Sequence, residues 1–238
     1  MRLLDNIKFI PLFFLLLHSV MGQSSLRSGI DGVLLDAASN KLIGAKLEEE
    51  GKFFIHDDFL IGDLKSYGLG KLEDVPMRYD LFRDQMEIVI KGDKFALKEN
   101  YIKSFSWYDT KSFRRSRYVN VRDFEFKDYD KKGFIEIIFE DSVSLGFIKD
   151  ISVIRGSESP TLVPDANNDR IVELANYFIL ENENALELSN SKKKNVPIFG
   201  KYWNKLSTFV KQQKLSFRKE EDLIRIVKKY NELKKMNW

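Results

Sequence analysis

The 238-residue chain contains no cysteine, and it contains only two histidines, His18 and His56. The absence of cysteine excludes disulfide bonds, cysteine-ligated zinc, iron–sulfur clusters and thiol nucleophiles. His18 lies in the apolar leader described below, so the remaining chain has a single imidazole. Without disulfides, an exported chain has to obtain its stability from a hydrophobic core, for which a 43% apolar composition suffices.

The sequence also lacks an apolar run long enough to cross a bilayer as a helix. The run at residues 9–20 has about twelve residues, whereas a membrane-spanning helix needs roughly 20. Arg2 and Lys8 precede the run and the small residue Gly22 follows it, which is typical of a secretory signal. We therefore expect a signal peptide at residues 1–22, cleavage near Gly22, export to the periplasm or cell envelope, and no transmembrane span in the mature chain. An uncleaved anchor or a buried strand is the alternative.

Neither sign of charge dominates the whole chain. The 39 Lys and Arg against 36 Asp and Glu give a net charge of +3, which does not indicate a nucleic-acid-binding protein. The distribution is uneven, however: residues 191–238 carry 14 basic and 4 acidic residues (net +10), and residues 23–190 carry 23 basic and 31 acidic residues (net −8). We therefore divide the mature chain into a β-rich body (23–190) and a basic helical C-terminal subdomain (191–238) packed on that body.

The body shows short alternating apolar runs separated by polar turns, which predicts antiparallel strands. Their close spacing favours a sandwich, an open barrel or a strongly bent sheet. Together with the helical end, the pattern predicts an α+β fold: a mainly antiparallel β body followed by a C-terminal helical hairpin. Residues 30–50 are ambiguous between helix and strand. The predicted strands lie at residues 77–81, 86–90, 94–97, 102–107, 118–126, 134–139, 143–148, 177–180 and 185–188.

Two helices are predicted in the tail from apolar residues at spacings of three and four. The first starts near Pro197, since proline is tolerated in the first turn of a helix, and the second starts near Lys219. We expect both helices to dock on the body through their apolar stripes. The stripes consist of Phe199, Trp203, Leu206 and Val210 in the first helix, and of Leu223, Ile226, Val227, Tyr230 and Leu233 in the second.

Residues with catalytic or metal-binding potential are few and scattered. For the run from His56 to Asp58 we favour a polar turn over a metal or acid–base site, because no second histidine is present. The segment from Asp165 to Asp169 has closely spaced oxygen donors but lacks the glycine and glutamate of a calcium loop, which favours a turn. Arg114–Arg117 is basic beside an aromatic residue, but acidic residues follow it, which favours a solvated loop over a nucleic-acid contact. The sequence predicts no catalytic residue, metal ligand or cofactor.

The basic tail carries more positive charge than two solvated helices need. We expect some of its cations to contact an anionic surface, either lipid headgroups or an acidic envelope protein. The alternatives are steering toward the protein's own acidic body, or solubility alone. The residues predicted to make the contact are Lys211, Lys214, Arg218, Lys228, Lys229 and Lys235.

Several segments resemble an uncharacterised family of exported gram-negative envelope proteins. The resemblance is carried by the runs Val75–Leu81, Asp84–Glu87 and Glu221–Leu223 and by the pair Tyr230-Asn231. At Asp80 the family pattern has asparagine. The resemblance implies an exported β-rich protein with a helical end, and it brings no catalytic residues.

Three functions are compatible with these patterns. The first is an exported, non-catalytic interaction module, which requires no feature that the sequence lacks. The second is a carrier that holds a small apolar ligand in a β-lined pocket. The third is a hydrolase that uses carboxylates such as Asp57, Asp58 or Asp84, two of which would have to converge in a cleft.

Overall fold

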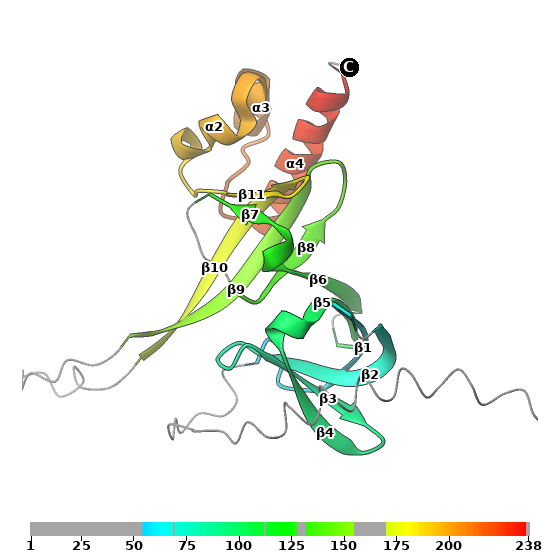
Figure 1. Cartoon of the computed structure of the whole chain (residues 1–238). Helices are drawn as coiled ribbons and strands as arrows, with labels where there is room; N and C mark the ends of the chain where they lie inside the picture. Colours follow the sequence, from blue (N-terminus) through cyan, green and yellow to red (C-terminus); the bar gives the residue numbers. More distant parts are fainter. Residues whose placement is uncertain (1–53, 69, 112, 128–131, 155–169, 237–238) are drawn as a thin grey trace, which may run out of the picture.

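The computed structural model describes residues 54–68, 70–111, 113–127, 132–154 and 170–236 (Figure 1). The predicted signal peptide (1–22), the ambiguous segment 30–50 and the predicted turn from Asp165 to Asp169 lie outside these residues.

The described residues form one sheet of eleven strands in the order β4-β3-β2-β1-β5-β6-β8-β9-β10-β11-β7. All neighbouring pairs are antiparallel except β11 and β7. The predicted α+β fold, with a mainly antiparallel body followed by a C-terminal helix pair, is confirmed. The strands are β1 (Leu60–Ser66), β2 (Lys71–Asp80), β3 (Gln85–Ile90), β4 (Asp93–Lys98), β5 (Ile102–Asp109), β6 (Arg114–Asn120), β7 (Glu125–Phe126), β8 (Phe134–Phe139), β9 (Ser144–Ile154), β10 (Arg170–Glu181) and β11 (Asn184–Glu187).

The C-terminal part is helical, as the apolar spacing predicts. It starts with the short helices η5 (Lys192–Asn195), α2 (Val196–Phe199) and η6 (Gly200–Tyr202), and continues with α3 (Trp203–Gln212) and α4 (Glu220–Lys235). The first predicted helix is divided at Gly200, whose φ of 48° is a left-handed conformation that suits glycine. Acidic residues occupy the first turn of α4 and lysines its last turn, which complements the helix dipole.

Two hydrophobic cores lie on one face of the sheet, which we call the inner face. The strand core is enclosed by β1–β6 and contains Leu64, Met77, Tyr79, Met86, Ile88, Phe105 and Trp107. The helix core joins Leu145 and Ile179 of the sheet to Leu206, Leu223, Ile226 and Val227 of α3 and α4. A row of cross-strand partners connects the two cores along the inner face: Leu64, Phe105, Tyr118, Glu136, Phe147 and Tyr177.

The opposite, outer face of the sheet carries a smaller core. Ile135, Ile148 and Phe178 are buried there, and Phe126 of β7 packs edge-to-face on Phe178. In Figure 1, β7 and β11 cross β9 and β10 near the end of these strands that lies beside the helices. The helices thus contribute to the core on one face only.

Two of the differences from the sequence prediction concern β1 and the segment that follows β6. β1 was not predicted, because Gly62 and Asp63 interrupt its apolar alternation. The predicted strand at residues 118–126 ends at Asn120, and the chain then forms a 3-10 helix, η3 (Val121–Asp123). The side chain of Asn120 accepts a hydrogen bond from the Arg122 N–H, and this local bond competes with the strand.

Candidate functional site

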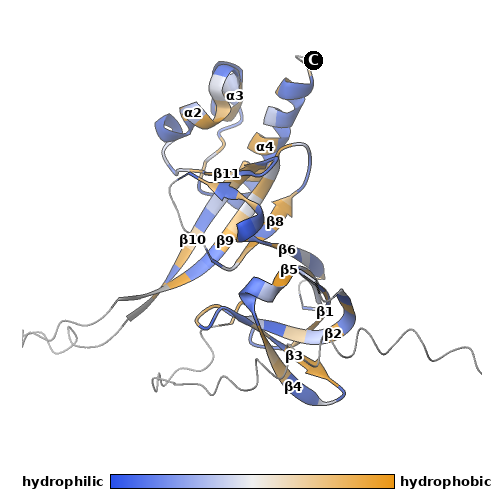
Figure 2. Cartoon of the chain, viewed as in Figure 1, coloured by the Kyte–Doolittle hydropathy of each residue, from blue (hydrophilic) through white to orange (hydrophobic). Residues whose placement is uncertain are grey.

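The helices α3 and α4 use their apolar stripes to pack on the sheet. Leu206, Val210, Ile226 and Tyr230 are buried, whereas Trp203 is only partly buried against the same core. Because the apolar stripe faces the sheet, the lysines between its members face solvent. Figure 2 shows hydrophilic residues along the last turns of α4 toward the C-terminus.

Three of the six predicted contact residues lie at the turn between α3 and α4. Lys211, Lys214 and Arg218 are exposed, and none of them forms an ion pair with a residue that the structure describes. We call Lys211, Lys214, Arg218 and the exposed Lys219 the basic turn. The three acidic residues that begin α4, Glu220, Glu221 and Asp222, follow directly, and Asp222 accepts the Ser216 N–H at 3.0 Å.

Backbone hydrogen bonds fix the shape of the basic turn. Lys214 has a φ of 53°, and the bonds Lys214 N–H to Lys211 C=O and Leu215 N–H to Val210 C=O close the end of α3. Further along, the Ser216 hydroxyl oxygen accepts the Arg218 N–H at 3.2 Å. The cations therefore project from a defined loop.

The other three predicted contact residues lie on α4 and have intramolecular partners. Lys228 lies over the Phe139 ring at 5.4 Å, Lys229 pairs with Glu232 at 2.8 Å, and Lys235 pairs with Asp141 at 3.1 Å. The hydrogen bond from the Ser142 N–H lowers the pKa of Asp141, and the hydrogen bond from Lys235 lowers it further. Lys229 thus neutralises a carboxylate of its own helix and Lys235 one of the body, and only the second pair is of the kind that the intramolecular alternative supposes.

Two of the three carboxylates considered for hydrolysis have separate partners. Asp58 pairs with Lys111 at 2.6 Å, and Asp84 accepts from the Tyr79 hydroxyl at 3.2 Å. For Asp57 it is the backbone carbonyl oxygen, not the carboxylate, that accepts from Arg78. His56 lies in a bend and packs edge-to-face on Trp107. Within the described ranges, no group of three or more His, Asp or Glu residues could hold a metal ion.

The predicted loop at Arg114–Arg117 is wrong, because these residues form most of β6. Arg114 lies on the inner face between Glu136 at 3.3 Å and Glu220 at 3.6 Å, and Arg115 and Arg117 on the outer face pair with carboxylates of neighbouring elements. Charged residues are accommodated in this strand because each arginine has a carboxylate partner across the sheet.

Family models, curated proteins and solved structures gave no match to this chain. None of the helices within the described ranges is long and apolar enough to cross a membrane.

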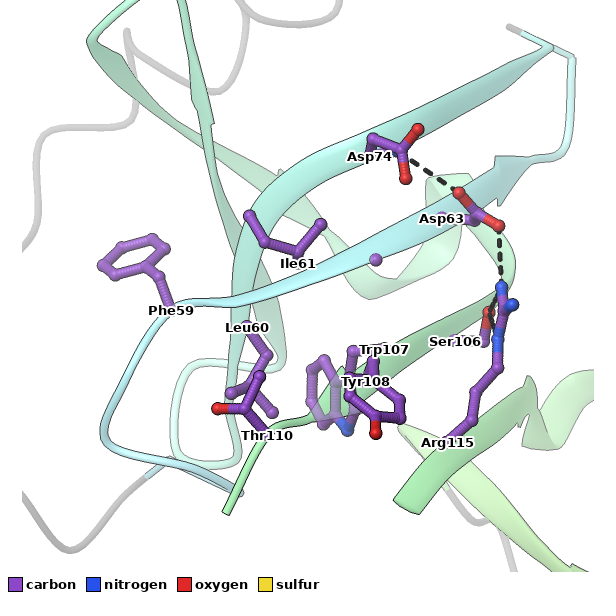
Figure 3. A pocket seen from close by; sticks show the side chains of 11 residues that line it. Phe59, Leu60, Ile61, Asp63, Asp74, Ser106, Trp107, Tyr108, Thr110 and Arg115 are labelled. Carbon is purple, nitrogen blue, oxygen red and sulfur yellow. Dashed lines mark hydrogen bonds and ion pairs between the residues drawn. The ribbon is translucent and has the colours of Figure 1, made fainter. Parts of the chain in front are cut away.

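A hollow on the outer face of β1, β5 and β6 was not predicted. It has a volume of about 420 Å³. In Figure 3 its polar residues are joined by dashed lines on one side, and its aromatic and aliphatic residues lie on the other. Its position depends on the register between β1 and β5, strands that are not adjacent in sequence. We call it the outer hollow; it is lined by Phe59, Leu60, Ile61, Gly62, Asp63, Asp74, Ser106, Trp107, Tyr108, Thr110 and Arg115.

Proposed function

We propose that this protein is an exported, non-catalytic binding module of the cell envelope that contacts an anionic surface through the basic turn. The supporting observation is the division among the predicted contact residues. Lys229 and Lys235 have carboxylate partners, whereas Lys211, Lys214 and Arg218 are exposed and have none among the described residues. The resemblance to exported envelope proteins and the pattern at residues 1–22 support the location.

The arrangement of the helices favours a surface contact over insertion into a membrane. The apolar stripes of α3 and α4 are already buried in the helix core, so they have no apolar face left for the acyl region. Attraction to anionic headgroups is worth about 1 kcal/mol per lysine or arginine near the surface and is screened within a Debye length. A contact through four cations is therefore reversible and sensitive to salt.

The two alternative functions find less support in the packing. A carrier with its ligand between the sheet and the helices would need space there, and buried side chains such as Leu145, Leu206 and Ile226 fill this region. The β-lined outer hollow is lined in part by charged residues, which does not suit a wholly apolar ligand. A hydrolase would need two carboxylates that share a site, and Asp58 and Asp84 are engaged with different partners.

Sedimentation with vesicles tests the proposal. The purified mature protein is mixed with vesicles of neutral lipid alone or with a third of anionic lipid, at 25 mM and 500 mM salt. We expect binding to anionic vesicles at low salt only. The triple variant Lys211→Glu, Lys214→Glu and Arg218→Glu should lose this binding, because it changes the charge of the basic turn by six.

A matched variant controls for net charge. Lys65→Glu, Lys91→Glu and Lys98→Glu also change the charge by six, at exposed positions on β1, at the β3–β4 turn and on β4. This variant should bind anionic vesicles nearly as well as the wild type. Equal losses in both triple variants would show a general charge effect, and binding that is indifferent to salt would contradict the surface contact.

A further inference from the structure

The outer hollow has an apolar end and a polar end set by strand register. Ile61, Tyr108 and Arg115 are direct cross-strand partners on β1, β5 and β6, so they form one row on the outer face. Asp63 and Ser106 are partners in the next row. Ile61 is 50% exposed and Tyr108 is 44% exposed, which leaves an aliphatic and an aromatic side chain side by side in solvent.

Phe59 forms the wall at the apolar end, and cations hold it in place. The Arg78 guanidinium lies 3.8 Å from the centroid of the Phe54 ring and 4.6 Å from that of Phe59, and it pairs with Glu87 at 2.8 Å. Such stacking positions the segment that leads into β1. The wall is thus part of a fixed structure, which lowers the entropic cost of binding.

The polar end is equally fixed. Arg115 Nη2 donates to Asp63 Oδ2 at 2.8 Å and to Ser106 Oγ at 3.0 Å, and the Asp74 N–H donates to Asp63 Oδ1 at 3.2 Å (Figure 3). Asp74 has a φ of 52° and lies where the register between β1 and β2 shifts, a local irregularity of the kind found beside binding sites. These bonds hold the carboxylate and the guanidinium against each other in the lining of the hollow.

The polar end carries three carboxylates against two cations. Asp63 pairs with Arg115, Lys71 Nζ lies 2.6 Å from Glu73 Oε1 and 3.7 Å from Asp63 Oδ2, and Asp74 is exposed. An anionic ligand would therefore gain no net attraction. Arg115 Nη1 nevertheless forms no hydrogen bond with a described residue, and Asp74 and Thr110 are exposed, so the site offers both donors and acceptors to a neutral partner.

We propose that the outer hollow binds a neutral sugar ring of a glycan. A pyranose has an apolar C–H face and a rim of hydroxyl groups that both donate and accept hydrogen bonds. The C–H face matches Ile61 and Tyr108, and the hydroxyl rim matches Asp74, Ser106 and Arg115. The volume of about 420 Å³ lies within the usual range for small-ligand sites and accommodates one or two sugar rings.

The sugar site and the basic turn are independent. The hollow is built on β1, β5 and β6, whereas the basic turn connects α3 and α4. Failure of the vesicle experiment therefore leaves the sugar site untouched, and the reverse also holds.

Isothermal titration of the full mature chain tests the site with four neutral hexasaccharides: maltohexaose, cellohexaose, mannohexaose and chitohexaose. We expect at least one to bind with a dissociation constant below 1 mM. Tyr108→Ala should weaken that binding at least tenfold, because it removes the aromatic surface under the sugar. Arg115→Met, which keeps most of the aliphatic stem, should weaken it several-fold.

Tyr101→Ala is the matched control, since Tyr101 is also a part-exposed tyrosine (36%) but does not line the hollow. It should bind as the wild type does, and unchanged circular dichroism should show that all three variants are folded. Absence of binding by all four sugars would overturn the proposal, as would equal binding by wild type and Tyr108→Ala. Tighter binding of an acidic hexasaccharide, such as hexagalacturonate, would overturn the charge argument and with it the proposed ligand class.

Discussion

The side chain of Asn231 in α4 pairs with the backbone of Val143, which lies 88 residues earlier in the chain, just before β9. Its Oδ1 accepts the Val143 N–H at 2.9 Å and the Ser142 hydroxyl at 2.7 Å, and its Nδ2 donates to the Val143 carbonyl at 2.8 Å. Nδ2 also donates to the Val227 carbonyl within α4 at 3.1 Å. Asn231 is buried, so one amide joins the last helix to the sheet with every polar atom satisfied.

Asn231→Ala should be strongly destabilising. The substitution leaves both backbone polar groups of Val143 without these partners in a buried position, and an unsatisfied buried group costs about 1–3 kcal/mol. We therefore expect a loss of about 2–4 kcal/mol in the free energy of unfolding, measured by urea denaturation. Asn204→Ala, at an exposed position of α3, should change this free energy by less than about 0.5 kcal/mol. Similar effects of both substitutions would contradict the role given to Asn231.

Ile226→Ala tests the docking of the helices on the sheet. Ile226 is completely buried in the helix core, and truncating such a residue typically costs about 2–5 kcal/mol. Trp203→Ala should lower the free energy of unfolding less than truncation of a fully buried tryptophan would, because Trp203 lies at the edge of this core. Met236→Ala, at a 73% exposed apolar position, is the control and should leave the melting curve unchanged. An unchanged melting curve for Ile226→Ala would mean that the helices are not docked.

Asp84→Asn should stabilise the protein at neutral pH. Burial raises the pKa of Asp84 above its ordinary value of 3.8; the hydrogen bond from Tyr79 opposes this shift and the charges of Glu99 and Asp150 add to it. Because the folded state holds this proton more tightly than the unfolded state, ionisation of Asp84 lowers stability as pH rises above 3.8. Asparagine cannot ionise, can still accept from Tyr79, and tolerates the φ of 48° at this position.

Thermal melts between pH 3 and pH 7 measure this effect. The melting temperature of Asp84→Asn should equal that of the wild type below pH 3.8 and exceed it increasingly as the pH rises. Asp93→Asn, at the exposed first position of β4, should show no comparable gain. A gain that is constant across the pH range would point to a backbone effect rather than to ionisation.

Gly62→Ala should be more destabilising than Gly146→Ala. A methyl group on Gly62 would overlap the backbone carbonyl oxygen of Ser106, whereas one on Gly146 would meet the side-chain ends of Ile135 and Leu180. Side chains can adjust but a paired strand cannot, so we expect a cost of about 3 kcal/mol or more at Gly62, at or above the upper end of the usual range for overpacking. Urea denaturation of both variants measures the difference, and an equal or smaller cost at Gly62 would contradict the close approach of β1 and β5.

Local periodicity predicted the elements whose apolar residues lie on one buried face. The strand at residues 86–90 alternates in burial, the strand at 134–139 is a short apolar run, and the stripes of α3 and α4 recur at helical spacing, so these elements were predicted correctly. β1 was not predicted because Gly62, Asp63 and Lys65 give it no apolar alternation: they lie on the outer face or at the close contact with β5 and not in a core. The register between β1 and β5 is a long-range property, and no local pattern encodes it.

The sequence locates the basic turn and the outer hollow only in part. Net charge indicates that the tail is basic, but only the structure separates Lys235 from Lys211 and Lys214, which form no ion pair with a described residue, because the partner of Lys235, Asp141, lies 94 residues away. The outer hollow combines residues from four strands and the segments beside them, most of which are unremarkable in the sequence. In the sequence Arg115 stands out only as part of a basic run, because its hydrogen-bond partner Asp63 lies 52 residues earlier in the chain.

The junction between β6 and β8 is narrow. Three residue pairs join these strands, from Tyr118 with Glu136 to Asn120 with Phe134, whereas eleven pairs join β9 and β10. The next ladder, between β8 and β9, also has only three pairs. β8 is therefore held by a short ladder on each side, and it is the narrowest link between the strands that carry the outer hollow and those on which α3 and α4 pack.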